Sequence, residues 1–341
     1  MLARIVALFL ALLVTGLAAA RPAVADTYHI TIAGAPTELP HWLPLYVARA
    51  KFFADEGITA DWVPLRSGSA EVAAVMGGSA QIAAVGVELP IQSYVNGGDL
   101  ILIADLFDLQ PYSIVLSNAA LAKTGITASM PSVEKIQRLR GLKLAITGPG
   151  SATDDFIRNV LKLHGIDADG FLSLQPLGDP DAMLAALQRN LVDGFIMSAP
   201  ADELAAQRNI GKPVLDAFSG GLPELSDVPF AGLVTTKRQL AANPALFQAV
   251  VTAIAKSIRY IHEHPAETRK LLRPYFADLD DKTFEKIITK YSRASATTAV
   301  VTRSEYNAAL RWANLHSTTT ISAPYDAVVD SAMARKAMAA H

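Results

Sequence analysis

The stretch "LAITGPGSATDD", Leu144–Asp155, decides the fold, because a strand-like run stops at Gly148-Pro149-Gly150 and an amphipathic helix begins after it. A strand, a glycine turn and a helix form the unit from which parallel α/β sheets are built. Ser151 followed by Asp154 predicts a capping box at the start of the helix. The glycines also keep the approach to the helix clear, which a ligand needs and a simple cap does not.

Two nucleotide-binding motifs come close to this turn without matching it. Gly148-x-Gly150 resembles the start of a dinucleotide fingerprint, but Thr153 takes the place of the third glycine, and no acid at the end of a strand stands in a convincing ribose position. A phosphate-binding P-loop would need a Gly-Lys-Ser/Thr sequence, which is missing here. His262 and His264 lie on a polar helix end and predict solvent exposure rather than a metal site. We therefore expect no cofactor and no metal.

Strands and helices alternate along most of the chain. The predicted strands are Tyr28–Ala33, Ile58–Leu65, Gln81–Val85, Leu100–Leu106, Tyr112–Leu116, Leu142–Ile146, Leu172–Leu177, Gly194–Met197, Lys212–Leu215 and Phe230–Thr235. Helices are expected between them, and only helices are expected after Lys237. Turn-like stretches at Phe107–Pro111 and Phe218–Pro229 predict two crossings between lobes. Lobe I would hold residues 26–108 and 230–341, and lobe II would hold residues 109–229.

An internal repeat supports two lobes of related design. Residues 70–86, "AEVAAVMGGSAQIAAVG", align with residues 182–198, "AMLAALQRNLVDGFIMS", at a constant offset of 112. Each copy predicts a small-residue helix, a polar turn and a buried strand. The turns that end such strands predict one rim on each lobe, where ligands bind in open α/β sheets. These turns lie at Ile32–Pro36, Arg66–Ser69, Gly86–Pro90 and Ser198–Pro200.

The N-terminus has the pattern of a secretory signal peptide. Arg4 precedes an apolar run, and Ala23 and Ala25 form an Ala-x-Ala site, so cleavage after Ala25 is expected. Removing residues 1–25 takes away two arginines and no acid, which moves the net charge from -2 to -4. Nucleic acid is an unfavourable partner for such a surface. With no cysteine, the exported chain must be held by packing alone, and we expect a periplasmic monomer.

The sequence resembles the periplasmic substrate-binding proteins of ABC importers in the nitrate/sulfonate/taurine branch, which includes the NMT1/THI5-like proteins. Residues 39–86, 139–166 and 185–200 carry the resemblance. It implies a type II periplasmic binding protein fold, in which two α/β lobes are joined by two hinge crossings and the C-terminal helices pack on lobe I. It also implies a cleft that closes on a small solute and delivery of that solute to permease subunits. Gln81 departs from the usual acid, which Asp193 keeps in the second repeat.

The candidate ligand-binding residues stand at the predicted rims and crossings. They are His41, Trp42, Arg66, Ser69, Glu88, Tyr112, Gly150, Ser151, Thr153, Ser198 and Phe230. Arg66 can grip a sulfonate or carboxylate with two parallel hydrogen bonds, and Glu88 can bind an amine. Trp42, Tyr112 and Phe230 can cover an organic ligand, and hydroxyls beside the helix that follows Gly150 can add neutral donors.

These observations predict a binding protein for an anionic or zwitterionic organic solute such as a sulfonate, a taurine-like compound or a carboxylate. No set of catalytic residues is evident, and "SGS" at residues 67–69 is no nucleophile elbow. Two alternatives stay open. One is a binder of a thiamine-pyrimidine precursor or another aromatic ligand. The other is an enzyme similar to the pyrimidine synthases, which the signal peptide and the lack of cysteine oppose.

Overall fold

The computed structural model describes residues 28–226, 228–315 and 317–340. The predicted signal peptide and its cleavage site lie outside these residues. None of the helices in the described part of the chain combines the length and the apolar character that a membrane crossing requires.

The first half of the molecule is built on a five-stranded sheet of order β2-β1-β3-β10-β4. Its strands are β1 (Tyr28–Gly34), β2 (Ile58–Pro64), β3 (Ile82–Gly86), β4 (Leu100–Phe107) and β10 (Ala231–Thr236). β1 pairs in parallel with β2 and β3, whereas β10 runs antiparallel to β3 and β4. Its helical segments are η1 (Pro40–Trp42), α2 (Leu43–Val47), η2 (Ala48–Phe52), α3 (Phe53–Asp55), α4 (Gly68–Gly77) and α5 (Glu88–Val95). We call this half lobe I.

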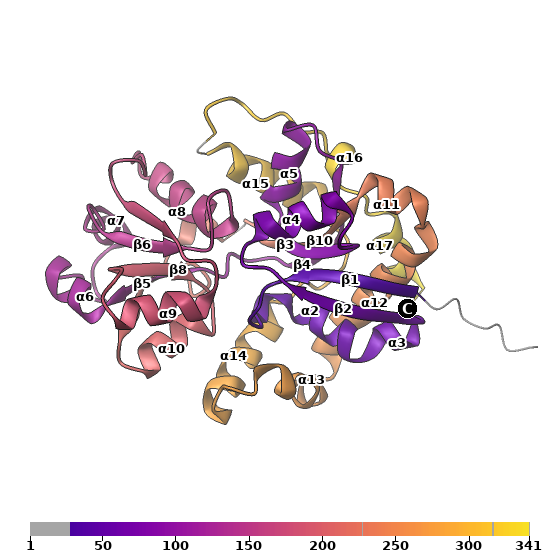
Figure 1. The fold of residues 1–341 in the computed structure, drawn as a ribbon, viewed down its shortest axis with the longest axis horizontal. Helices are drawn as coiled ribbons and strands as arrows, with labels where there is room; N and C mark the ends of the chain where they lie inside the picture. Colours follow the sequence, from indigo (N-terminus) through magenta and orange to yellow (C-terminus); the bar gives the residue numbers. More distant parts are fainter. Residues whose placement is uncertain (1–27, 227, 316, 341) are drawn as a thin grey trace, which may run out of the picture.

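The second half, lobe II, is built on a sheet of order β7-β6-β8-β5-β9 (Figure 1). Its strands are β5 (Ser113–Ser117), β6 (Lys143–Ile146), β7 (Ser173–Pro176), β8 (Gly194–Met197) and β9 (Gly211–Asp216). Its helical segments are α6 (Asn118–Thr124), α7 (Ser132–Gln137), α8 (Ala152–Leu163), α9 (Pro180–Gln188), α10 (Ala201–Gln207) and η3 (Pro223–Leu225). The α/β fold predicted from the sequence is therefore present, with one mixed sheet in each half.

The two sheets repeat one design, as the sequence offset of 112 predicts. In lobe I, the backbone N–H of Thr31 donates to Gln81 Oε1 over 2.6 Å. In lobe II, the backbone N–H of Lys143 donates to Asp193 Oδ2 over 2.8 Å. Both pairs of positions differ by the repeat offset. The Gln81 side chain thus accepts the same bond as the acid that it replaces.

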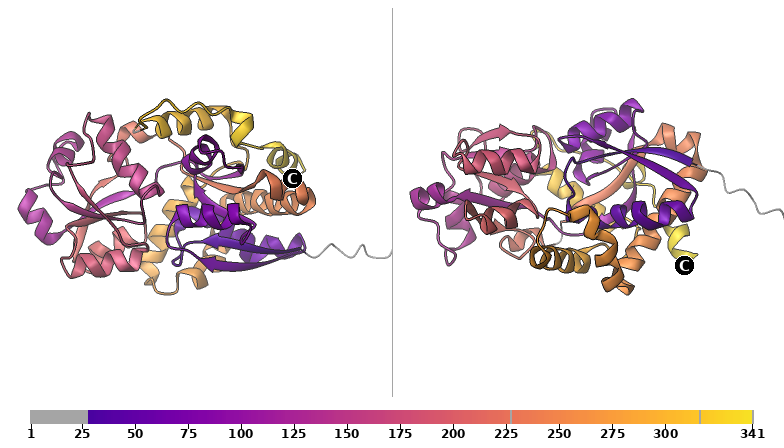
Figure 2. Two further views of the ribbon diagram at one scale, coloured as in Figure 1. Left: turned by 45° about the horizontal axis from the view of Figure 1, so that its top comes forward. Right: turned by 60° about the horizontal axis from the view of Figure 1, so that its bottom comes forward.

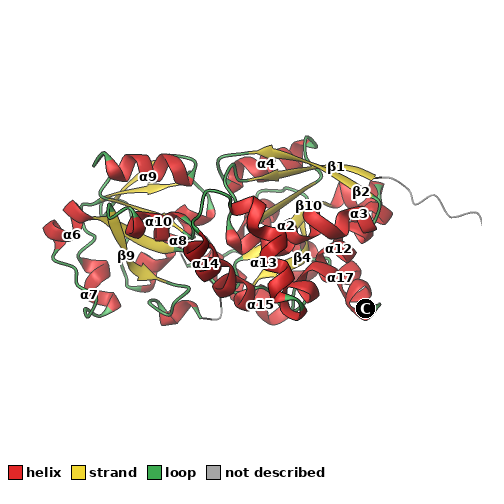
Figure 3. Cartoon of the chain, turned by 90° about the horizontal axis from the view of Figure 1, so that it is seen from below, coloured by secondary structure: helices red, strands yellow, loops and turns green. Residues whose placement is uncertain are grey.

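The C-terminal helices pack mainly on lobe I (Figure 2). They are α11 (Lys237–Ala242), α12 (Pro244–Glu263), α13 (Pro265–Leu272), η4 (Arg273–Phe276), α14 (Asp281–Ala294), α15 (Arg303–Asn314), α16 (Tyr325–Val328) and α17 (Ala332–Ala339). α12 contacts α2 and α17, and α15 contacts α5. α14 also reaches lobe II, because Lys286 Nζ lies 2.9 Å from Glu203 Oε2 on α10 (Figure 3).

The chain passes between the lobes twice, after β4 and before β10. The strands of the first sheet come from residues 28–107 and 231–236, and those of the second come from residues 113–216. The two passages lie side by side, because Phe230 N–H donates to Phe107 O and Gln110 Nε2 donates to Pro229 O. The exact lobe boundaries at residues 108/109 and 229/230 stay predictions.

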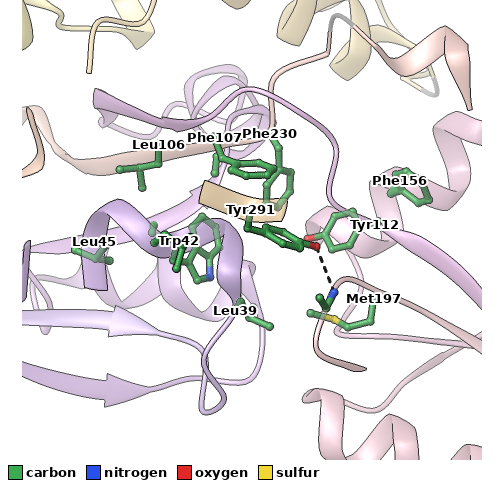
Figure 4. Close-up of a cluster of buried hydrophobic side chains, with 14 of the residues drawn as sticks. Leu39, Trp42, Leu45, Leu106, Phe107, Tyr112, Phe156, Met197, Phe230 and Tyr291 are labelled. Carbon is green, nitrogen blue, oxygen red and sulfur yellow. Dashed lines mark hydrogen bonds between the residues drawn. The ribbon is translucent and has the colours of Figure 1, made fainter. Parts of the chain in front are cut away.

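Aromatic side chains join the cores of the two lobes beside these passages (Figure 4). The Tyr291 ring from α14 stacks on Phe107, with centroids 5.6 Å apart, and lies 4.7 Å from Phe218. Its hydroxyl accepts a hydrogen bond from the backbone N–H of Ala199 over 3.4 Å. The hydrophobic core is therefore continuous across the interface.

Candidate functional site

A cavity of about 50 Å³ lies between the lobes, where strands of both sheets end. From lobe I it is lined by Ala35 after β1, Leu65 after β2 and Gly86 at the end of β3. From lobe II it is lined by residues that end β8 or follow β6 and β7, namely Met197, Thr147 and Gly178. All three turns predicted for the rim of lobe I contribute to this lining, whereas the predicted turn of lobe II, Ser198–Pro200, does not. Such a position at the carboxyl ends of strands is typical of ligand sites in open α/β sheets.

Four rings form one wall of the cavity. They belong to His41, Trp42, Tyr112 and Phe230, all of which are buried and were predicted ligand-binding residues. The His41 ring lies 4.4 Å from Trp42 and 4.9 Å from Phe230, and the Tyr112 ring lies 5.1 Å from Phe230. Figure 4 shows Trp42, Tyr112 and Phe230 around the interface. Edge-to-face contacts of this kind stabilise the packing of the rings against one another.

His41 is the polar group within this wall. Burial lowers the pKa of His41 to about 3, so the imidazole is neutral at physiological pH. Its Nδ1 lies 3.3 Å from Ser198 Oγ. Its Nε2 is buried and has no hydrogen-bond partner among the residues that the structure describes. Because buried polar atoms in native proteins are rarely left unpaired, Nε2 is available to a ligand.

Glu71 is a further cavity residue, and the sequence prediction missed it. It lies on α4, lines the cavity and is 5% exposed. Burial raises the pKa of Glu71 well above its usual range, so the neutral carboxyl group can donate a hydrogen bond. A signal for it exists in the sequence, because Glu71 is the single charged residue in the small and apolar stretch of residues 67–80.

Arg66 stands at the mouth of the cavity, after β2. It lines the cavity but is exposed to solvent, and none of the ion pairs of the described residues involves it. Its stem packs on Gly178 of lobe II, where an added Cβ would lie 3.1 Å from Arg66 Cβ and Cδ. Gly178 also has a φ of 86°, which favours glycine. The guanidinium is therefore a free cation beside the point where the lobes meet.

The start of α8 differs from the capping box predicted for it. Ser151 is the N-cap residue, but its side chain makes no capping bond. Its hydroxyl instead lies 2.8 Å from Thr147 Oγ1 and 3.0 Å from Thr153 Oγ1. Thr153 Oγ1 in turn accepts the backbone N–H of Thr147, and Asp154 Oδ2 accepts that of Gly150. The capping-box prediction was wrong because these closer partners at the strand end compete for the hydroxyls.

Six predicted ligand-binding residues do not line the cavity: Ser69, Glu88, Gly150, Ser151, Thr153 and Ser198. A Cβ on Gly150 would meet nothing within 4 Å, so its φ of 65°, rather than close approach, requires glycine there. Two other residues near the start of α8, Thr147 and Ala152, line the cavity. The ligand-binding roles of these six residues stay predictions.

Glu88 lies behind the cavity wall. It is 1% exposed, and its carboxyl group lies against Gly86. Burial, and to a smaller extent the charge of Asp155 in lobe II, raises the pKa of Glu88 to about 8. Gln92, one turn further along α5, donates to Asp155 Oδ2 over 2.6 Å. Glu88 therefore does not line the cavity, and its Oε1 is buried with no hydrogen-bond partner among the described residues.

Comparison with known proteins places the chain in a family. The sequence profile of the NMT1-like family matches residues 38–275, which include the whole of lobe II and begin just after the turn Ile32–Pro36. The chain belongs to the NMT1-like family. No curated protein matches it by sequence.

Solved structures share the fold of this NMT1-like chain. A protein from Bordetella bronchiseptica RB50 superposes with a TM-score of 0.80 at 22% identity, over 91% of this chain and 97% of that chain. The periplasmic nitrate-binding protein NrtA from Synechocystis PCC 6803 has a TM-score of 0.68 at 17% identity, over 92% and 89%. The alkanesulfonate-binding protein SsuA from Xanthomonas axonopodis pv. citri, bound to MOPS, has a TM-score of 0.67 at 16% identity, over 90% and 100%. The chain thus has the type II periplasmic binding protein fold.

Proposed function

We propose that this NMT1-like protein is the periplasmic solute-binding component of an ABC importer. It captures a small anionic or zwitterionic organic solute between its lobes and presents the solute to permease subunits. The observation that carries the proposal is the cavity at the strand ends of both lobes, in which His41 Nε2 is buried without a partner among the described residues. Similarity to structures named as nitrate-binding and alkanesulfonate-binding proteins supports it.

The polarity of the cavity supports an organic solute with one polar end. The rings of Trp42 and Phe230 offer apolar contact, and the guanidinium of Arg66 offers a cation at the mouth. The N-terminus of α8, which begins at Ala152, adds the first N–H groups of the helix, which have no partner within the helix, and the positive end of a helix dipole. A sulfonate or carboxylate head near Arg66, with its carbon body against the rings, matches this arrangement.

An aromatic solute is the second candidate, and the four-ring wall favours it. A flat heterocycle can stack against Trp42 while a ring nitrogen or amino group pairs with His41 Nε2. In this case Glu71, as a neutral carboxyl group, would supply a second hydrogen bond.

Contacts between the lobes support a mechanism of closure on the solute. Asn159 Nδ2 of α8 donates to the carbonyl of Trp312 on α15, and Gln92 of α5 donates to Asp155 of α8. Opening the cleft would break these bonds without disturbing either sheet. We therefore expect a rigid-body movement about the two passages, as in other hinged binding proteins.

A thermal-shift screen tests the proposed function and separates the two candidates. Sulfonates, nitrate, carboxylates, amino acids and pyrimidines are added singly to the purified protein. A ligand at about 100 times its dissociation constant adds about 2.7 kcal/mol of stability, which is a clear shift. The shift should shrink in His41→Phe, which keeps a ring but removes Nε2. A response of equal size in wild type and His41→Phe would place the binding site elsewhere.

Small-angle scattering tests closure with the compound that the screen identifies. The radius of gyration should decrease on binding if the empty protein is open in solution. If the radius of gyration does not change, the urea concentration at which the lobes open is measured for the empty and for the loaded protein. A higher concentration for the loaded protein shows that the solute holds the lobes together. A solute that alters neither would contradict a cleft-closing function.

A further inference from the structure

Three carboxylates gather where β4 ends, close to the first passage between the lobes. They belong to Asp105 on β4, Asp108 just after it, and Glu305 on the first turn of α15. One oxygen from each lies within 4.8 Å of the others. These residues are not part of the cavity between the lobes, since none of them lines it.

Backbone groups fix two of these carboxylates and leave other oxygens unused. The N–H of Leu106 donates to Asp105 Oδ1 over 2.8 Å, and the N–H of Thr302 donates to Glu305 Oε2 over 2.7 Å. Asp105 is only 3% exposed, and its Oδ2 is buried with no hydrogen-bond partner among the described residues. Asp108 Oδ1 is likewise buried and has no hydrogen-bond partner among the described residues. An unpaired, buried carboxylate oxygen needs an explanation, because its desolvation is costly.

A β-bulge helps to bring these groups together. On β10, Ala231 faces Phe107 and Gly232 faces Asp105, so Leu106 is an extra residue on β4. Bulges redirect side chains and are frequent next to functional sites. The backbone N–H of Asp105 also donates to Ala299 O over 3.0 Å, which ties β4 to the segment that leads into α15.

The charges of this cluster are not balanced by the protein. None of the ion pairs in the described residues involves Asp105, Asp108 or Glu305. A proton or a cation can relieve this excess of negative charge.

We propose that Asp105, Asp108 and Glu305 form a binding site for a hard divalent cation, for which Ca²⁺ is the best fit. The three side chains offer only carboxylate oxygens, the donors that Ca²⁺, Mg²⁺ and Mn²⁺ prefer. The three ligand oxygens all lie within 4.8 Å of one another, and Ca²⁺ accepts several carboxylates in a flexible coordination shell. Mg²⁺ demands near-octahedral geometry and usually keeps several of its waters, so it suits such a cluster of side chains less well.

The cation would connect parts of the chain that are about 200 residues apart in sequence. It would fix Asp108, in the first passage between the lobes, to the start of α15. The site is independent of the proposed solute-binding function, and its role would be to stabilise the end of β4 and the adjoining passage.

Titration of the full chain with CaCl₂, after a chelator has removed any bound metal ion, tests the site. We expect one Ca²⁺ per chain by calorimetry and a higher melting temperature. Tb³⁺ in place of Ca²⁺ should show luminescence sensitised by Tyr306, which shares a small cavity with Asp105 and Glu305. Asp108→Asn should weaken Ca²⁺ binding at least about tenfold.

Glu305→Gln is a second variant, which tests the site in case Asp108→Asn fails to fold. Glutamine serves as well as glutamate in a capping box, so the start of α15 should stay intact while one ligand charge is lost. The matched control is Asp326→Asn, which removes an exposed acid paired with Arg303 on α15. Loss of the Ca²⁺ response in Asp108→Asn and Glu305→Gln, with the response retained in Asp326→Asn, supports the site.

Two results would overturn the proposal. The first is a wild-type chain that shows no response to Ca²⁺, Mg²⁺ or Mn²⁺, while Asp108→Asn melts at a higher temperature. Asp105 and Asp108 would then share a proton instead of a cation. The second is a Ca²⁺ response of wild-type size in both Asp108→Asn and Glu305→Gln, which would place the cation at other residues.

Discussion

Arg66 and Gly178 occupy equivalent positions in the two repeats and pack against each other across the cavity. Each precedes the residue that caps a helix: Ser67 Oγ accepts the N–H of Ala70 at the start of α4, and Asp179 Oδ1 accepts that of Ala182 at the start of α9. One lobe thus supplies a cation, and the other supplies the space for its stem. The difference between two copies of one turn determines which lobe provides the charge at the mouth.

Gly178→Ala should weaken solute binding because the new Cβ would press on Arg66 and hold the lobes apart. Gly170→Ala is the matched control: its φ of 78° imposes similar strain, but an added Cβ there would meet nothing within 4 Å. Both changes should lower stability by about 1 kcal/mol through the left-handed backbone. Calorimetry with the solute from the screen should show weaker binding in Gly178→Ala alone. Equal affinities in the two variants would mean that the Arg66–Gly178 contact has no role in closure.

Arg66→Gln should reduce affinity for an anionic solute by about fivefold to thirtyfold, corresponding to about 1–2 kcal/mol. The effect is moderate because the guanidinium is exposed and water screens its charge. Stability without solute should not change, since none of the ion pairs of the described residues involves Arg66. Titration at low and high salt checks the cause, because the loss should be larger at low salt. An affinity that does not change in the variant would mean that the solute head lies away from the mouth.

Glu88→Gln should make stability less sensitive to pH. The pKa of Glu88 is about 8 in the folded protein and about 4.5 when exposed, so between these values the folded state holds a proton that the unfolded state has released. The free energy of unfolding must therefore fall as pH rises through this window. Glutamine cannot ionise, and the variant should recover about 2–4 kcal/mol of the stability that wild type loses between about pH 5 and pH 9.

Urea denaturation across this pH range measures the effect of Glu88→Gln. Asp202, whose pKa burial raises to about 7, contributes a slope of the same sign and should remain in the variant. Glu263→Gln, at the exposed end of α12, is the control and should retain the wild-type pH dependence. A steep loss of stability toward pH 9 in Glu88→Gln would assign the slope to other buried acids.

Gln81→Ala and Asp193→Ala should destabilise the protein to similar extents, by about 1–2 kcal/mol each. Each change removes the acceptor of one backbone N–H, Thr31 in lobe I and Lys143 in lobe II. Gln81→Glu should be tolerated, because a carboxylate accepts the same bond. Chemical denaturation of the three variants measures this. If Gln81→Glu were as unstable as Gln81→Ala, the equivalence of the two positions would be lost.

The sequence by itself determined the elements and their order. The run Leu144–Asp155 predicted a strand, a turn and a helix, and the structure has β6 and α8 there. The repeat offset predicted two related halves, and the sheets have equivalent strand orders. Strand and helix periods are local properties, and the turns at strand ends follow from glycine and proline over a few residues. The rim of lobe I was therefore predictable, as were the rings of Trp42 and Phe230 beside it.

The tertiary structure alone decided which polar groups are buried, which are paired and which meet. Ser198 closes a strand of lobe II, yet its hydroxyl lies 3.3 Å from Nδ1 of His41, which comes from lobe I. Glu71 belongs to the cavity only because α4 turns it between the lobes. Asp108 and Glu305 are nearly two hundred positions apart in the sequence, and their meeting depends on α15 returning to β4. Desolvation, pKa and hydrogen-bond competition depend on neighbours from distant segments, and no local pattern records those neighbours.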